Sequence, residues 1–259
     1  MDDMMPVLFV GHGNPMNALA DNRYTRGWAA IGRSMPPPRA ILAISAHYYI
    51  PFRMVTTSPR PITIHDFSGF PDELYQIRYP APGSPELAGR VMDLLAPQRL
   101  RSDADWGLDH GTWSVLVHMF PRAEIPVVQL SMDENQPPAV HHDIGLRLMP
   151  LRQEGVLVVG SGNLVHNLVR YRWRDRDGAP FDWAARFESR VRQCLLDGDP
   201  DPLVHYDQFG DDAHLAVPTP DHYLPFLYAL GLRREADPVS FPVEGVDGGS
   251  VSMLAVRFG

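Results

Sequence analysis

The sequence of 259 residues contains no lysine, because all 23 of its basic residues are arginine. Without lysine the chain cannot form a Schiff base with pyridoxal phosphate, and it has no lysine general base. It also lacks the phosphate-binding lysine of Walker-type NTPases. Codon usage in a GC-rich genome explains the bias most simply, but the chemical consequence holds in any case: these enzyme classes are excluded.

Cysteine is almost absent as well. Cys194 is the single cysteine, so the chain cannot form an internal disulfide, and we expect a reducing, cytoplasmic location. Its neighbours Val191, Leu195 and Leu196 predict that Cys194 packs in the core from a helix rather than acting as a nucleophile.

Two classes of partner lack support in the composition. No apolar run reaches the ~20 residues needed to span a bilayer, and the acidic start Met1–Met4 lacks the basic region of a signal peptide. A net charge of -8 gives no sign of the basic patch that nucleic-acid binding requires. We therefore expect no membrane and no nucleic acid as partners.

What the chain does have is material for a large core: 44% of its residues are hydrophobic, and its 26 prolines and 21 glycines are dispersed. These features predict a single domain over residues 1–259. Strand and helix patterns alternate, which predicts a three-layer α/β/α fold with a central mixed, largely parallel sheet. We expect strands at 5–10, 40–45, 53–57, 126–131, 155–160 and, as an edge strand, 250–257. We expect helices at 24–33, 85–95, 114–120, 138–152, 162–170, 181–197, 201–206 and 221–230.

Three of the buried strands are each followed by a histidine. His12 comes directly after the first apolar run, His47 follows the run 40–46, and His166 lies just beyond the run 156–160. In open α/β sheets, ligands bind outside the carboxyl ends of the strands. Because neutral imidazole suits Fe, Zn, Cu and Ni, the pattern predicts a metal site at this edge.

Two further histidines are candidates for the same site. His222 lies in a Pro-Asp-His sequence suited to the start of a helix. His110 stands between Asp109 and Gly111, with tryptophans on either side. Five histidines are interpreted as ordinary surface or core residues, and His65 is left undecided; the five are His118, His141, His142, His205 and His214.

A loop rich in proline and aromatic residues, 59–71, is predicted to form a wall or lid over the site. Apolar walls for a ligand are expected from Phe67, Phe70, Tyr48 and Trp113, although core packing explains these four equally well. Two other motifs fail: Gly160-Ser161-Gly162 is not a nucleophile elbow, and Gly11-His12-Gly13 is not a dinucleotide-binding fingerprint.

With these residues in view, the chain resembles the 4,5-DOPA extradiol dioxygenase family, within the class III, LigB-type extradiol ring-cleavage dioxygenases. The matching motifs run in order along nearly the whole chain: Gly11–Met16, Ile44–Tyr48, Ile64–Pro71, Tyr79–Pro85, Trp106–Trp113, Gly160–Leu168 and Pro218–Tyr223.

The resemblance implies a single non-haem metal ion, Fe(II) for activity or Zn(II) as bound, held by His12, His47 and His222. It implies that His110 and His166 act as acid and base, with His166 also a possible fourth ligand. The substrates would be O2 and a small catechol such as DOPA. One departure stands out, because non-haem iron sites usually combine two histidines with a carboxylate. Here His222 takes the place of the carboxylate, with Asp221 beside it as a candidate partner.

Two other functions remain open from the sequence. Three histidines around zinc can also activate water, as in a zinc-dependent hydrolase. A non-enzymatic, Memo-like metal-binding protein would keep the same cleft, but it would not need the acid and base. The sequence leaves open which catechol is cleaved, at which bond, and the oligomeric state.

Overall fold

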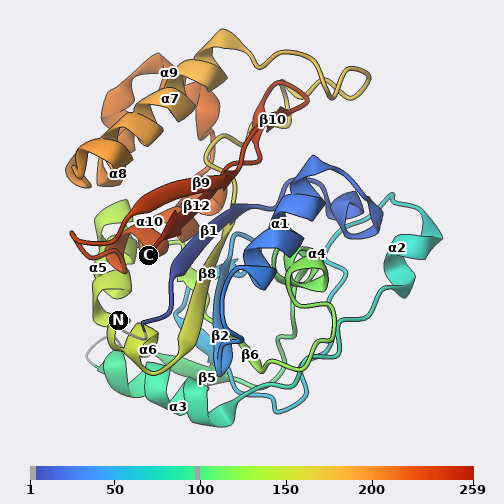
Figure 1. Ribbon diagram of the computed structural model, residues 1–259, viewed down its shortest axis with the longest axis vertical. Coiled ribbons are helices and arrows are strands. Elements are labelled where there is room, and N and C mark those ends of the chain that lie inside the picture. Colours follow the sequence, from blue (N-terminus) through green and yellow to red (C-terminus); the bar gives the residue numbers. More distant parts are fainter. Residues whose placement is uncertain (1–3, 97–99) are drawn as a thin grey trace.

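A six-stranded sheet forms the middle of the computed structural model, which describes residues 4–96 and 100–259 (Figure 1). Its order is β6-β2-β8-β1-β12-β9. The first four of these strands are parallel to one another, whereas β12 is antiparallel to both of its neighbours. The sheet is therefore mixed and largely parallel, as predicted. In sheet order the strands are β6 (Val127–Gln129), β2 (Ala40–Ser45), β8 (Val156–Gly162), β1 (Val7–Gly11), β12 (Ala255–Phe258) and β9 (Val239–Val243).

Shorter strands of the described part of the chain pair in twos: β3 (Tyr49–Ile50) with β7 (Met132–Asp133), β4 (Met54–Thr56) with β5 (Arg101–Asp103), and β10 (Val246–Asp247) with β11 (Val251–Ser252). The α-helices are α1 (Arg23–Arg33), α2 (Asp72–Gln76), α3 (Pro85–Leu94), α4 (His110–Met119), α5 (Pro138–Arg147), α6 (Pro150–Gln153), α7 (Asp182–Asp197), α8 (Asp201–Val204), α9 (Asp211–Ala216) and α10 (Leu224–Gly231). Single 3-10 turns are η1 (Pro15–Leu19), η3 (Tyr206–Phe209) and η4 (Pro220–His222).

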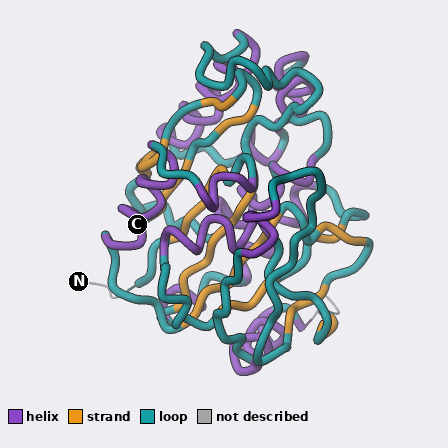
Figure 2. The backbone as a smooth tube through the Cα atoms, turned by 90° about the vertical axis from the view of Figure 1, so that its right-hand side faces the viewer, coloured by secondary structure: helices purple, strands orange, loops and turns teal. Residues whose placement is uncertain are grey.

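Helices cover both faces of the sheet, which confirms the three-layer fold. Alternate side chains of β1 enter two separate core clusters: Val7 and Phe9 pack with α3, α5, α7 and α10, whereas Leu8 and Val10 pack with α1 and α4. Figure 2 views the molecule from the side of α1 and α4 and shows helices lying in front of the strands. All residues of β1, β2 and β8 are buried, as expected of strands covered on both faces. None of the helices in the described ranges is long and apolar enough to cross a membrane.

Helices α1 and α4 begin at residues able to satisfy their free N–H groups. Asn22 and Thr25 form a reciprocal capping box at the start of α1. Asp109 caps α4 by accepting a hydrogen bond from the Thr112 N–H. The helix therefore begins at His110, four residues earlier than predicted, and His110 lies in its first turn.

The helix predicted over 162–170 is wrong. The segment is irregular because its backbone donors bond to distant parts of the chain: the N–H of Asn163 to His222 O, that of His166 to Ala216 O and that of Asn167 to Ser250 O. These bonds fix the segment beside η4 and β11 and leave no i−4 helical ladder.

Other elements differ in extent. The predicted helix 138–152 is divided at Pro150, which lacks an N–H and begins α6. The strand predicted at 250–257 is two strands, and β12 is not at the edge of the sheet, because β9 pairs with its outer side. The sequence gives little sign of β9, which mixes exposed and buried positions and contains Pro242.

Candidate metal centre

The carboxyl ends of β1, β2 and β8 bring their following residues to one edge of the sheet, as predicted. The strands are neighbours, with Gly11 opposite Gly162 and Ser45 opposite Ser161. The pairing continues just past the strands, where the N–H of His12 donates to Gly162 O at 3.1 Å and that of Ala46 to Ser161 O at 2.9 Å. The backbone next to His12 and to His47 is thus held by hydrogen bonds to β8.

The third member of the cluster, His222, comes from η4 and reaches the same edge because β8 carries glycines there. A Cβ atom at Gly162 would lie 2.1 Å from His222 O, and one at Gly160 would lie 2.4 Å from Pro225 O. Only glycine lets the backbone of η4 and α10 approach the strand this closely. His222 is thereby placed beside His12, from which 210 positions of the sequence separate it.

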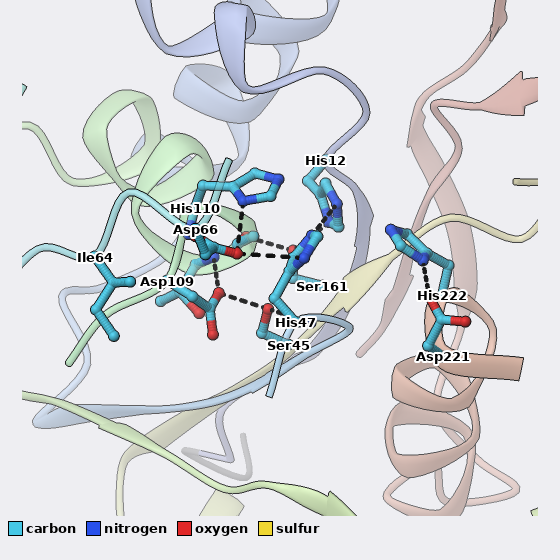
Figure 3. Close-up of polar contacts among 12 residues, drawn as sticks. His12, Ser45, His47, Ile64, Asp66, Asp109, His110, Ser161, Asp221 and His222 are labelled. Carbon is cyan, nitrogen blue, oxygen red and sulfur yellow. Dashed lines mark hydrogen bonds and ion pairs between the residues drawn. The ribbon is translucent and has the colours of Figure 1, made fainter. Parts of the chain in front are cut away.

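The imidazoles of His12, His47 and His222 form a group whose ligand nitrogens all lie within 4.8 Å of one another (Figure 3). The Nε2 atoms of His12 and His47 are 3.1 Å apart. Since a metal–nitrogen bond measures about 2.0–2.1 Å, two nitrogens bound to one ion in neighbouring positions stand about 3 Å apart. The spacing observed therefore fits a shared metal ion.

The other ring nitrogen of each imidazole faces a hydrogen-bond acceptor. The Nδ1 of His12 lies 3.0 Å from the hydroxyl of Ser161, which itself donates to Gly111 O, and must therefore be the donor to Ser161. The Nδ1 of His222 contacts Asp221, its predicted partner, and that of His47 lies 3.4 Å from Asp66. With Nδ1 protonated, each Nε2 offers a lone pair. Converging lone pairs repel one another unless a cation lies between them, so this donor set fits a metal.

The pKa shifts of the metal-site histidines agree with metal binding. Burial lowers the pKa of His12 and of His47 well below the ordinary value of 6.5, and the neighbouring histidines lower both further. Both rings are therefore neutral near pH 7, which is the form that binds metals. Burial alone would raise the pKa of Asp221, but its hydrogen bond to His222 and the charge of that ring lower it to about 2.

His110 lies beside this group, with its ring centre 3.8 Å from that of His47. Its partner is Asp66, which accepts from the backbone N–H of His110 at 2.9 Å and from its Nδ1 at 2.9 Å. The neighbouring Asp109 instead bonds to Ser45 and Gln129, each at 2.6 Å. Our sequence reasoning missed the role of Asp66, although the residue lies in the predicted aromatic loop.

His166 lies on the other side of His222. The two rings stack in parallel, with centres 3.5 Å apart and planes 8° apart. Burial, followed by the charge of His222, lowers the pKa of His166 to about 2, so its ring is neutral. The group of three ligand nitrogens does not include it. Its assignment as a fourth ligand or a proton shuttle therefore stays a prediction.

The histidines open onto a cavity of about 220 Å³. Phe67 and Phe70 line it, as predicted, whereas the predicted Tyr48 stacks on Trp106 and Trp113 packs behind Phe67. His65 packs against Phe67 and bonds to Ile77 O, so it belongs to the aromatic wall. The remaining wall was not predicted and comes from the irregular segment after β8 and from the β10–β11 hairpin: Leu168, Tyr171, Trp173, Asp247 and Val251.

Comparison with known proteins decides the family. Residues 9–254 match the family described as the catalytic LigB subunit of aromatic ring-opening dioxygenase. The chain belongs to this LigB family. Its members depend on a non-haem metal, and the histidine group described above is where a metal fits.

Individual LigB relatives are similar over almost their full length. The chain is 49% identical to a 4,5-DOPA dioxygenase extradiol of Escherichia coli K12, over 98% of this chain and 95% of that protein. It is 36% identical to the protein of that name from Beta vulgaris, over 99% of this chain and 97% of the relative. A crystal structure of an uncharacterized Escherichia coli K12 protein superimposes with a TM-score of 0.85 at 44% identity, covering 98% of this chain and 100% of that one.

These comparisons confirm the resemblance, the fold and the enzyme class. The chain is an extradiol-type, aromatic ring-opening dioxygenase of the LigB family. Of the functions left open by the sequence, ring opening is the one that its relatives share.

Proposed function

We propose that this LigB-family enzyme opens the ring of a small catechol, DOPA or a close analogue, with O2, using a metal ion held by His12, His47 and His222. The observation that carries the proposal is the convergence of three imidazole nitrogens on one cavity, with His110 beside them. The relatives from Escherichia coli and Beta vulgaris that are named 4,5-DOPA dioxygenase extradiol support the choice of substrate.

The residues around the metal group are suited to moving protons. Because the Nδ1 of His110 donates to Asp66, its Nε2 carries the lone pair. That atom can accept a proton from a catechol hydroxyl and return it later in the reaction, as an imidazole acting as general base and then general acid does. His166 lines the same cavity and is proposed as the second proton-transfer group.

We propose Fe(II) as the active metal. Bound ferrous iron supplies the redox chemistry between catechol and dioxygen, which Zn²⁺ cannot supply. Three neutral imidazoles also suit zinc, so the same residues would hold zinc in an inert form.

The cavity supports a small, single-ring substrate. Its volume lies below the ~300 Å³ at which pockets for drug-sized ligands begin. The described residues that line it include one carboxylate, Asp247, and no arginine. Asp247 is held in place by Tyr171 and Arg176, each at 2.7 Å. The carboxylate is therefore already ion-paired with Arg176, and the lining does not distinguish substrates by the charge of their side chain.

The test is oxygen uptake by iron-loaded and zinc-loaded protein with DOPA, dopamine and 3,4-dihydroxyphenylpropionate. We expect uptake and a yellow ring-opened semialdehyde with the iron form only. Absence of uptake with either form, together with ester or amide hydrolysis by the zinc form, would establish the hydrolase instead.

Two further expectations concern the domain organisation and the cellular location of the protein. The core clusters draw residues from Met5 to Phe258, which supports a single domain over residues 1–259. A cytoplasmic location stays a prediction from the single cysteine.

A further inference from the structure

One carboxylate in the site serves two imidazoles. The Oδ2 atom of Asp66 lies 2.9 Å from the Nδ1 of His110 and 3.4 Å from the Nδ1 of His47 (Figure 3). Its Oδ1 atom accepts the backbone N–H of His110 at 2.9 Å. Residue 66 as a whole is exposed, yet its side chain is only 16% exposed.

The other two metal-site histidines are arranged differently. The acceptor for His12 is the hydroxyl of Ser161, and the acceptor for His222 is Asp221. Each of these acceptors contacts one imidazole of the group of three. Asp66 contacts one imidazole of that group and one imidazole outside it.

We infer that Asp66 is a positioning residue that sets the tautomer of His47 and of His110 together. An ionised carboxylate only accepts hydrogen bonds, so the Nδ1 of His110 must carry a hydrogen. The Nδ1 of His47 faces the same oxygen at 3.4 Å, and the negative charge there favours a hydrogen on that atom as well. The Nε2 of His47 then faces the Nε2 of His12, and the Nε2 of His110 is left with its lone pair. The roles that these two atoms perform, metal binding and proton transfer, rest on the proposed function; the tautomers do not.

The shared contact with Asp66 couples metal binding by His47 to proton transfer by His110. If Asp66 released His47, the same oxygen would move relative to His110, because both rings contact Oδ2. A change at Asp66 should therefore affect metal affinity and turnover together, whereas a change at Asp221 should act on His222 alone.

The variant Asp66→Asn tests this with almost no change of shape. One carboxylate oxygen becomes an NH2 group, which donates and cannot accept. The amide can therefore accept from the backbone N–H of His110 or from the imidazoles, but not from both sides. Asp221→Asn is the matched control, and Asp66→Glu, which keeps an acceptor-only group, is the conservative variant.

The first measurement is ¹⁵N NMR of the imidazoles in the metal-free full chain, with assignments from His47→Gln and His110→Gln. In the unmodified protein we expect His47 and His110 both to be protonated at Nδ1. Asp66→Asn should move at least one of them to the Nε2–H form, and Asp221→Asn should leave both unchanged. The same comparison is made on proteins shown to unfold cooperatively, with Asp66→Ala, which also removes the carboxylate, taking the place of Asp66→Asn if the latter does not fold.

The second measurement is Zn²⁺ affinity by competition with a chelator, and the third is turnover of DOPA by iron-saturated protein. In Asp66→Asn we expect each to fall about 10- to 100-fold, the usual cost of losing a carboxylate that orients a metal-bound histidine. Asp66→Glu should recover part of both losses, which a purely structural role of the loop would not produce.

The inference is overturned if Asp66→Asn keeps both Nδ1–H signals, or if zinc affinity and turnover stay at the level of the unmodified protein. Its failure is distinct from failure of the proposed function. If the iron-loaded, unmodified protein consumes no oxygen with any catechol, the function is wrong, while the NMR and zinc measurements still decide the role of Asp66.

Discussion

The two ends of the parallel strands both bury ionisable side chains, but these side chains have opposite roles. At the amino end of β1, the guanidinium of Arg152 donates to Met5 O at 2.8 Å, to Leu232 O at 2.7 Å and to the carboxylate of Asp237. At the carboxyl end, the histidines bond to acceptors through Nδ1 and leave Nε2 facing a cavity. Arg152 and Asp237 are hydrogen-bonded within the fold, whereas the Nε2 atoms of the histidines are available to bind a ligand.

The comparison shows that burial and charge alone do not identify a site. The side chains of Arg152 and Asp237 are 1% and 2% exposed, which is a more complete burial than that of His47 at 21%. What separates the two ends is whether the strongest donors and acceptors already have partners. An unused lone pair beside a cavity indicates a ligand, whereas a saturated ion pair indicates stability.

The largest effect is expected from removing one metal-site imidazole at the carboxyl end of the strands. His12→Ala, His47→Ala or His222→Ala should each reduce bound metal from about one ion per chain to almost none, and abolish oxygen uptake, because each takes away one of three converging nitrogens. The fold should survive. Metal analysis and circular dichroism check this, with His205→Ala, at a half-exposed surface histidine, as the control that keeps its metal. Full occupancy in all three site variants would contradict the assignment.

A smaller loss is expected at the histidine outside the metal group. His110→Ala should keep its metal and lose turnover by about 10²- to 10⁴-fold, the range for loss of a general acid or base. Metal analysis and oxygen uptake of the same preparation separate the two effects. Loss of the metal, or turnover at the normal rate, would show that His110 has a different role.

At the opposite end of the strands, the expected effect is on stability instead of turnover. Arg152→Met leaves the buried Asp237 carboxylate without its main partner and should lower the free energy of unfolding by about 3–5 kcal/mol. Urea unfolding measures this, and activity per folded molecule should be unchanged. Arg186→Met breaks the ion pair with Asp212, in which the arginine is 62% exposed, and should cost less than ~1 kcal/mol. Equal losses of unfolding free energy in the two variants would show that the buried ion pair stabilises the fold no more than the exposed one.

The mildest change is a dependence on pH. Burial raises the pKa of Asp237, but its hydrogen bonds to Arg152 and to the Arg234 backbone outweigh this and lower it below the ordinary 3.8. The stability it contributes is therefore complete above the unfolded pKa, about 3.9, and is lost as the pH falls through the lower, folded value. Below about pH 4, the unfolding free energy should fall less steeply for Asp237→Asn than for the unmodified chain. Identical slopes would contradict the lowered pKa.

Sequence patterns predicted the parts of this molecule that depend on local order. The apolar runs of β1, β2 and β8 are recognisable because both of their faces are buried, and His12 and His47 follow from them directly. The pairing of Asp66 with His110 spans 44 positions and depends on the path of an irregular loop, so no spacing rule reveals it. The local pattern of the segment after β8 predicts a helix. The backbone partners that prevent one, Ala216 and Ser250, lie far away in the sequence and cannot be inferred from the segment itself.

The close approach of η4 to β8 has a consequence for redesigning this enzyme. Any side chain at Gly162 would meet the main chain of His222, since a Cβ atom there lies 2.1 Å from the carbonyl oxygen. Position 162 is thus a control point for the separation between the strand-borne imidazoles and the one carried by η4. A library meant to exchange the metal or resize its coordination sphere can vary position 162, which acts on His222 through its main chain and replaces no metal-site imidazole. A library meant to alter substrate choice alone should keep that glycine fixed and vary the outer wall at Leu168 and Trp173.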